Sequence, residues 1–227
     1  MSPRSQNFAD DFHKIKILGA HNSKVRTSDQ AEIAFFWEDG PPGGTPSGHF
    51  LSIAAQLFQG KFDTYTLARN MALVSMSQAD AGIAAWDSKY YYNIMRPETA
   101  IRKRGQNLGN KDSRVRIDPN WQSLILTPPF PAYISGHSTF GAAGMRMIWN
   151  CLGTNNITYT LRPIDLAWWP EQLKGVTRRY TSLWQAAEDN GLSRLYGGVH
   201  WTPDHTEGMR IGRELADDTF SRHFRPI

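Results

Sequence analysis

The sequence has little of what would mark a secreted or membrane protein. Its one cysteine among 227 residues, Cys151, excludes an intrachain disulfide. No stretch approaches the roughly 18 apolar residues of a membrane span, and the N-terminus lacks the apolar centre of a signal peptide. The net charge of +4 is too small to indicate nucleic acid or a membrane surface as a partner. We therefore expect a soluble protein, cytoplasmic by default.

The composition is otherwise that of an ordinary globular protein, with 40% hydrophobic and 20% charged residues. The length allows one domain or two small ones. Cys151 lies in an apolar stretch, which favours a buried, inert thiol over a catalytic one. The densest basic run, residues 102–104, is interpreted as a solvated loop because the other basic residues are dispersed.

Helical signals dominate the chain, and we find no convincing strand alternation. Residues 103–132 are rich in glycine and proline and predict a long loop, with one short helix near Trp121. An N-terminal segment, residues 1–26, precedes a single helical domain, residues 27–227. The fold class is therefore all-α, a helical bundle. The expected helices are 28–37, 46–60, 63–96 (ended by Pro97), 138–152, 177–195 and 203–222, the last with Thr202 as its N-cap.

Three separated blocks gather positive charge and hydrogen-bond donors. The first is Lys89 with Arg96, seven residues apart on the expected long helix and therefore on nearly the same face. The second is Ser-Gly-His at 135–137, where a helix N-terminus favours an anion. The third is Arg194 followed by His200 and Asp204. Together they suit a tetrahedral oxyanion such as phosphate or vanadate.

Each block also has an ordinary structural interpretation. Lys89 and Arg96 would by themselves be exposed basic side chains, and a serine that caps a helix before a histidine is common. Asp204 could serve the dipole of the final helix, or its carboxylate could accept the Nδ1–H of His200 and leave Nε2 free. It is the conjunction of the blocks, in this order, that carries the functional interpretation.

The spaced pattern resembles the superfamily of vanadium-dependent haloperoxidases and type 2 phosphatidic-acid phosphatases. The pattern is Lys89, six residues, Arg96-Pro97; Ser-Gly-His at 135–137; then Ser193-Arg194, five residues, His200, three residues, Asp204. Flanking residues are closer to the haloperoxidases of the vanadium chloroperoxidase-like branch. They are Trp86, the run 96–102, the run Pro129–Tyr133 and the run Ser135–Phe140.

The resemblance implies a vanadate cofactor, with phosphate able to occupy the same site. His200 would bind vanadium, with Asp204 orienting its imidazole. His137 would be the acid–base residue, and Lys89 would also polarise the bound peroxide. The implied reaction oxidises halide with hydrogen peroxide to a hypohalous species that reacts with a small organic acceptor. The residues implied to hold the vanadate oxygens are Lys89, Arg96, Ser135, Gly136 and Arg194.

Two aromatic residues bear on the halide. Trp86 and Phe130 match positions where the chloroperoxidases carry aromatic residues, whereas bromoperoxidases tend to have histidine at the latter. This favours a chloride-competent pocket, although both rings are equally well explained as core residues.

Alternatives and departures accompany the resemblance. The same site would support a soluble acid phosphatase that works through a phosphohistidine at His200, and a degenerate oxyanion-binding or interaction domain is a third interpretation.

Family members usually have proline where Ile134 precedes the second block. An earlier Pro-Ser-Gly-His at 46–49 precedes Lys89 and is interpreted as a helix cap. The family's soluble haloperoxidases commonly have two bundles, so this chain resembles the second, catalytic one; a homo-oligomer is compatible with the sequence.

Overall fold

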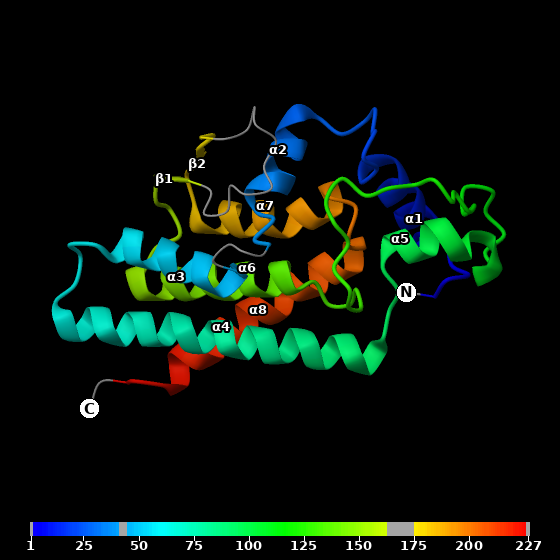
Figure 1. Cartoon of the computed structure of the whole chain (residues 1–227). Helices are drawn as coiled ribbons and strands as arrows, with labels where there is room; N and C mark the ends of the chain where they lie inside the picture. The colour runs from blue at the N-terminus through cyan, green and yellow to red at the C-terminus, as the bar shows by residue number, and fades with distance from the viewer. Residues whose placement is uncertain (1, 41–44, 163–174, 226–227) are drawn as a thin grey trace.

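The computed structural model describes residues 2–40, 45–162 and 175–225. Helices α3 (Thr45–Phe58), α4 (Thr64–Tyr92), α7 (Leu183–Tyr196) and α8 (Thr202–Arg222) surround the central helix α6 (Gly136–Leu152). Helix α2 (Ser28–Phe36) packs on α7 (Figure 1). The all-α helical bundle expected from the sequence is confirmed.

Helix ends follow local sequence chemistry. The Thr27 hydroxyl and the Gln30 side chain form a reciprocal capping box at the start of α2. Asp63 caps α4 through the N–H of Thr66, and α4 ends at Asn93, which adopts the left-handed conformation with φ of 47°. The expected 63–96 helix is thus wrong at its C-terminal end, since the chain turns away before Pro97.

Two further expectations differ from the structure. Residues 178–180 form a strand, β2 (Arg178–Tyr180), which pairs antiparallel with β1 (Tyr159–Leu161), so the expected 177–195 helix begins only at Leu183. The expected helix near Trp121 does not form; its indole instead donates to the Lys16 carbonyl oxygen at 2.9 Å. In both places a contact with a residue distant in sequence, a strand pairing or an indole hydrogen bond, takes the place of the expected helix.

Close helix packing in the bundle depends on glycines of α6 and α8. A Cβ at Gly212 would lie against the Thr139 carbonyl oxygen, and a Cβ at Gly144 would lie 2.7 Å from the ring of Phe50. The resulting large core lies between α2, α3, α4, α6, α7 and α8. Because α6 is held on all sides, its N-terminus at Ser135–Gly136 is fixed within the protein.

A second, smaller core joins the N-terminal helix to the loop region. Helix α1 (Gln6–Leu18) places Phe12 against Trp201, just before α8. Helix α5 (Pro97–Thr99) lies beside α1 in Figure 1. The π-helical turn η1 (Ala100–Arg104) and the 3-10 turn η2 (Gly105–Leu108) follow α5 in sequence. The long loop then returns to the bundle and leads into α6.

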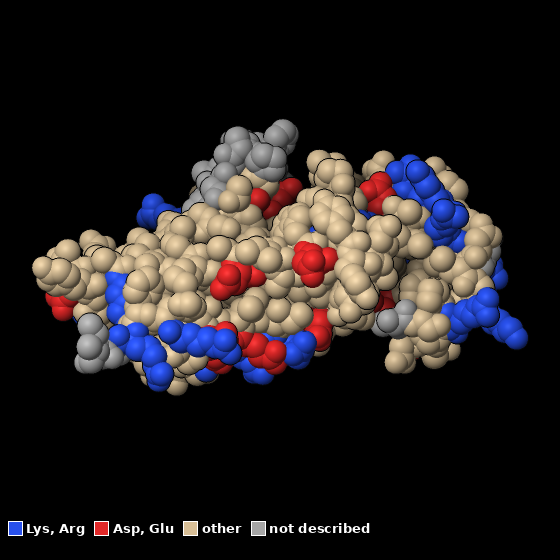
Figure 2. Space-filling view, turned by 90° about the horizontal axis from the view of Figure 1, so that it is seen from below, with Lys and Arg blue, Asp and Glu red and all other residues tan. Residues whose placement is uncertain are grey.

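The surface carries charges of both signs. Figure 2 shows basic side chains gathered at the end of the molecule that bears α5 and η1, and mixed acidic and basic side chains along the lower edge. Lys103 and Arg104 are exposed, as expected for a solvated run, but the expected loop is wrong here because both residues lie in the helical turn η1. Among the described residues, no helix combines the length and hydropathy that crossing a membrane requires.

Candidate active site

His200 lies in the short connection between α7 and α8, and its imidazole is buried. Its Nδ1 donates to Asp204 Oδ2 at 2.9 Å, and the same carboxylate oxygen accepts the N–H of Trp201 at 2.9 Å. Asp204 stands in the first turn of α8, so the backbone of that helix fixes the carboxylate. Burial and the nearby cations Arg96, Lys89 and Arg194 hold the pKa of His200 well below its ordinary value. The imidazole is therefore neutral, with its lone pair on Nε2.

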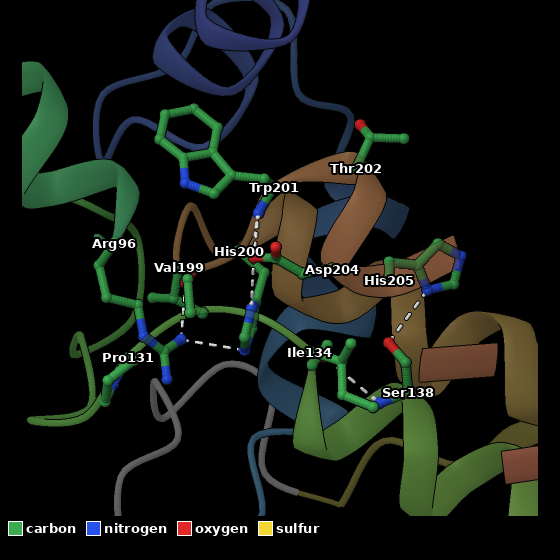
Figure 3. Close-up of polar contacts among 12 residues, drawn as sticks. Arg96, Pro131, Ile134, Ser138, Val199, His200, Trp201, Thr202, Asp204 and His205 are labelled. Atoms are coloured by element: carbon green, nitrogen blue, oxygen red, sulfur yellow. Dashed lines mark hydrogen bonds and ion pairs between the residues drawn. The ribbon is translucent and has the colours of Figure 1, made fainter. Parts of the chain in front are cut away.

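Arg96 lies on the other side of this imidazole, as Figure 3 shows. Its Nη1 donates to the Val199 carbonyl oxygen at 2.7 Å and lies 2.9 Å from His200 Nε2, and its Nε donates to the Phe130 carbonyl oxygen at 2.8 Å. Arg96 caps α5 instead of extending α4. The expectation that Lys89 and Arg96 share one helix is wrong, yet the turn at Asn93 still brings Arg96 to the site.

Lys89, in the last turn of α4, is fully buried. Its ammonium donates to three backbone carbonyl oxygens of the loop before α6, those of Pro131 at 3.0 Å, Ala132 at 2.9 Å and Ile134 at 2.6 Å. Burial and the charge of Arg96 lower the pKa of Lys89 to about 7. All three N–H groups already have acceptors, so direct contact with a bound anion would replace one of them.

Arg194 lies in the last turn of α7 and is 3% exposed. Its Nη1 makes one long contact, 3.5 Å, to the Glu38 carbonyl oxygen, and burial lowers its pKa to about 10. Burial likewise lowers the pKa of Arg96 to about 9. Three buried cations thus lie near His200, while its carboxylate partner, Asp204, is occupied by His200 and Trp201.

The Ser-Gly-His block forms the N-terminus of α6. Ser135 Oγ caps the helix by accepting the N–H of Ser138, and the N–H of Ser135 donates to the Asp204 carbonyl oxygen at 3.0 Å. A Cβ at Gly136 would lie 3.1 Å from the indole of Trp86, which explains the need for glycine there. Ile134, where the family usually has proline, is buried and follows a cis peptide bond.

His137 is half-buried at the start of α6. Its Nε2 lies 3.0 Å from the Glu38 carbonyl oxygen and can only donate to it, which leaves Nδ1 as the acceptor nitrogen of the neutral ring. Burial and the charge of Arg194 lower its pKa to about 3. A neutral imidazole beside a cationic site can accept a proton.

Two aromatic rings border the cations. Trp86 and Phe130 have ring centroids 5.3 Å apart, and Lys89 Nζ lies 5.7 Å and 5.4 Å from them. The guanidinium of Arg96 lies 5.0 Å from the Phe130 centroid. Both residues therefore belong to the wall of the cationic site.

Sequence reasoning missed one part of this wall, the Glu38–Asp39 turn after α2. The Glu38 carbonyl oxygen contacts both His137 and Arg194. The Asp39 carboxylate is held by His49, whose Nδ1 lies 2.8 Å from Asp39 Oδ1. His49 is the last residue of the Pro-Ser-Gly-His run interpreted above as a helix cap. That repeated motif was the available signal, but its position before Lys89 gave no indication of a contact with Asp39.

The donor set fits a tetrahedral oxyanion. Arg96 Nη2 and Arg194 Nε are buried and have no hydrogen-bond partner within the described part of the chain, and such orphaned donors are costly unless a ligand accepts from them. Among the described residues, no group of three or more His, Cys, Asp or Glu side chains is placed to hold a metal ion. The residues that could hold such a group are His200, Arg96, Arg194, Lys89, Ser135 and Gly136.

The chain is similar to known proteins in sequence and in fold. The chain is similar to the vanadium chloroperoxidase of Curvularia inaequalis, with 27% identity over 82% of this chain and 38% of that protein. The crystal structure titled as the first bacterial vanadium-dependent iodoperoxidase superimposes with a TM-score of 0.76 and 28% identity, covering 97% of this chain and 50% of that one. A holo-type bacterial vanadium-dependent chloroperoxidase shares the fold, with a TM-score of 0.66 and 18% identity over 95% of this chain and 48% of its own.

The chain thus spans half or less of the length of these relatives. The family model for the VCPO second helical-bundle domain matches residues 69–227, which include most of α4 and the three blocks of site residues. On this match the chain belongs to the family of the vanadium chloroperoxidase second helical-bundle domain, within the vanadium haloperoxidase-like branch.

Proposed function

We propose that this protein is a vanadate-dependent haloperoxidase that oxidises halide with hydrogen peroxide to a hypohalous species. One observation carries the proposal: three buried cations lie near a neutral imidazole, and two of their donor atoms are buried with no acceptor among the described residues. A buried excess of positive charge is unfavourable unless an anion binds there. We include in the proposal that residues 27–227 act as one catalytic domain, with residues 1–26 as an N-terminal segment.

His200 and Asp204 have the clearest roles. Asp204 holds the Nδ1–H, so the Nε2 lone pair is directed away from it and toward Arg96. A ligand at Nε2 would take the place of the Arg96 N–H, and Arg96 could then donate to the ligand's oxygens. Bound vanadate supplies Lewis-acid activation of peroxide without a change in oxidation state. Arg194, Ser135 and Gly136 would hold the remaining oxygens.

His137 would move the proton. Its Nε2–H is held by the Glu38 carbonyl oxygen, so Nδ1 accepts a proton from incoming peroxide and later returns it. In the absence of an anion, the charge of Arg194 helps to lower the pKa of His137 to about 3. An anion bound between them would offset that charge and raise the pKa toward the range useful for catalysis.

Trp86 and Phe130 would form the halide side of the site. Cations held over aromatic faces supply positive potential beside an apolar surface, and that combination suits a weakly hydrated halide. The small organic acceptor would react with the hypohalous product.

The direct test is halide oxidation by the metal-free protein supplied with vanadate and hydrogen peroxide. We expect bromide- or iodide-dependent oxidation of a phenol reporter that rises with vanadate and saturates. A folded protein that gains no such activity would contradict the proposal. Hydrolysis of p-nitrophenyl phosphate that vanadate inhibits, without halide oxidation, would instead establish the acid phosphatase alternative.

A further inference from the structure

A second buried histidine–aspartate pair lies behind the site. His49, in the first turns of α3, has its Nδ1 2.8 Å from Asp39 Oδ1, and both side chains are 1% exposed. The imidazole stacks on the indole of Trp37 at 4.8 Å between ring centroids, with Phe50 at 6.0 Å. Trp37 in turn donates its Nε1–H to the Tyr180 hydroxyl at 3.1 Å. The pair is therefore clamped in the aromatic core.

The residue before Asp39 reaches the active site. The carbonyl oxygen of Glu38 lies 3.0 Å from His137 Nε2 and 3.5 Å from Arg194 Nη1, so two residues of the candidate site share one backbone acceptor. Asp39 itself has a positive φ of 48°, in the left-handed region that aspartate tolerates better than most residues but still at some cost in free energy. Among the described residues, His49 supplies the one hydrogen bond to the Asp39 side chain.

We propose that His49 is a positioning residue: through Asp39 it fixes the Glu38–Asp39 turn, and the turn selects the tautomer of His137. A neutral imidazole has one N–H, and a carbonyl oxygen can only accept. While the Glu38 carbonyl is held in place, the proton of His137 stays on Nε2 and the lone pair stays on Nδ1. The catalytic consequence rests on the proposed function, whereas the tautomer of His137 does not.

Loss of the His49 donor would release this arrangement. The Asp39 carboxylate would then be buried without its hydrogen bond. The free-energy cost of that burial would favour a rearranged Glu38–Asp39 turn in which the carboxylate reaches solvent. Burial acts to raise the pKa of Asp39, but His49, His137 and Arg194 hold it below its ordinary value. The carboxylate is thus ionised, and an ionised buried group depends strongly on its partners.

The test uses protein labelled with 15N in its histidines, observed by NMR without vanadate, peroxide or halide. Three substitutions separate the position of the hydrogen-bond donor at residue 49 from the size of its side chain. His49→Asn places an amide N–H where Nδ1 lies, His49→Gln places one near Nε2, and His49→Phe keeps the ring without any donor. The His137 signals are assigned by their loss in His137→Gln, and His21→Asn, at an exposed position, serves as the control.

We expect wild type and His49→Asn to show His137 protonated on Nε2 alone. His49→Gln and His49→Phe should show averaging between the two tautomers. If His49→Phe fails to fold, His49→Gln carries the same prediction with a smaller change in shape. A His137 spectrum unchanged in folded His49→Gln, or altered equally in Asn and Gln variants, would overturn the inference.

Kinetics then connects the tautomer to turnover. In His49→Gln we expect kcat for halide oxidation to fall about tenfold. The Kd for vanadate should change no more than about threefold, because His200 and Arg96 are untouched and the contact of Arg194 with the Glu38 carbonyl oxygen is long, at 3.5 Å. His49→Asn should restore most of kcat. A wild-type protein without haloperoxidase activity would end the proposed function but leave the NMR result readable, so the two failures are distinguishable.

Discussion

The two buried histidine–aspartate pairs of this protein have nearly the same geometry and different surroundings. His200 Nδ1 lies 2.9 Å from Asp204 Oδ2, and both side chains are 3% exposed. His49 Nδ1 lies 2.8 Å from Asp39 Oδ1, and both side chains are 1% exposed. The Nε2 of His200 meets Arg96, with Lys89 and Arg194 nearby. The Nε2 of His49 is buried and has no hydrogen-bond partner in residues 2–40, 45–162 and 175–225, and its ring stacks on Trp37.

The difference shows that the imidazole–carboxylate contact does not by itself define a reactive site. In both pairs the carboxylate fixes the tautomer, so the second nitrogen is the variable that the surroundings control. Cations and orphaned donors around His200 make that nitrogen part of the proposed anion site. Aromatic packing around His49 makes its pair a support for the neighbouring turn. Four predictions test this comparison, in order of decreasing effect.

Replacement of His200 by alanine should have the largest consequence. With no imidazole nitrogen to hold vanadate, we expect kcat/KM for halide oxidation to fall by about a thousandfold or more. His49→Ala should cost far less activity under the same conditions. Steady-state kinetics of both variants, with circular dichroism to establish folding, checks the contrast, and equal losses would remove the functional distinction between the pairs.

Replacement of Asp204 by alanine should have the next largest effect. His200 would lose the partner that holds its Nδ1–H, so we expect vanadate affinity and turnover each to fall by about ten- to a hundredfold. His137→Ala should behave differently and spare binding more than turnover. Titration calorimetry beside kinetics separates the two, and an Asp204→Ala variant with wild-type affinity would show that the carboxylate serves only the helix.

Anion affinity should fall as the pH rises above neutrality. In the free site Lys89 has a pKa of about 7, lowered by burial and by Arg96. A bound anion raises that pKa, so binding above pH 7 requires uptake of a proton and weakens by up to about tenfold per pH unit. Calorimetry with tungstate, a tetrahedral dianion whose own charge stays constant in this range, measures the slope. A flat profile between pH 7 and 9 would mean that Lys89 is not linked to the anion.

The smallest effect concerns the rings beside each pair. Phe130 lies against the cations of the site, whereas Trp37 packs in the core. Phe130→His removes a cation–π partner of Arg96, and we expect the ratio of chloride to bromide oxidation to fall by about two- to fivefold. Trp37→Phe should instead lower thermal stability and leave that ratio unchanged. A halide ratio that responds to Trp37 and not to Phe130 would reverse the assignment.

Local sequence signals predicted much of the fold, because capping residues act within a few positions. Thr27 and Asp63 begin helices as expected, and the 138–152 helix differs by two residues at its start. The errors arise where a distant partner decides. Tyr180 pairs with Tyr159 in a strand, and Asn93 adopts a left-handed conformation that ends α4 before Arg96.

The candidate site follows the same division. Side chains with a characteristic spacing, such as His200 four residues before Asp204 in the first turn of α8, were accessible from the sequence. The carbonyl oxygens that accept from Lys89 have no side-chain signature, and the contact between Asp39 and His49 depends on how α2 and α3 approach each other. These roles therefore became visible only in the structure.

Vanadate titration tests the central claim most directly: the three buried cations and His200 form one oxyanion site. Calorimetry with element analysis of the dialysed protein should give one vanadate per chain, competed by phosphate and lost in His200→Ala. A folded wild-type protein that binds no vanadate, or binds it equally well without His200, would contradict the account.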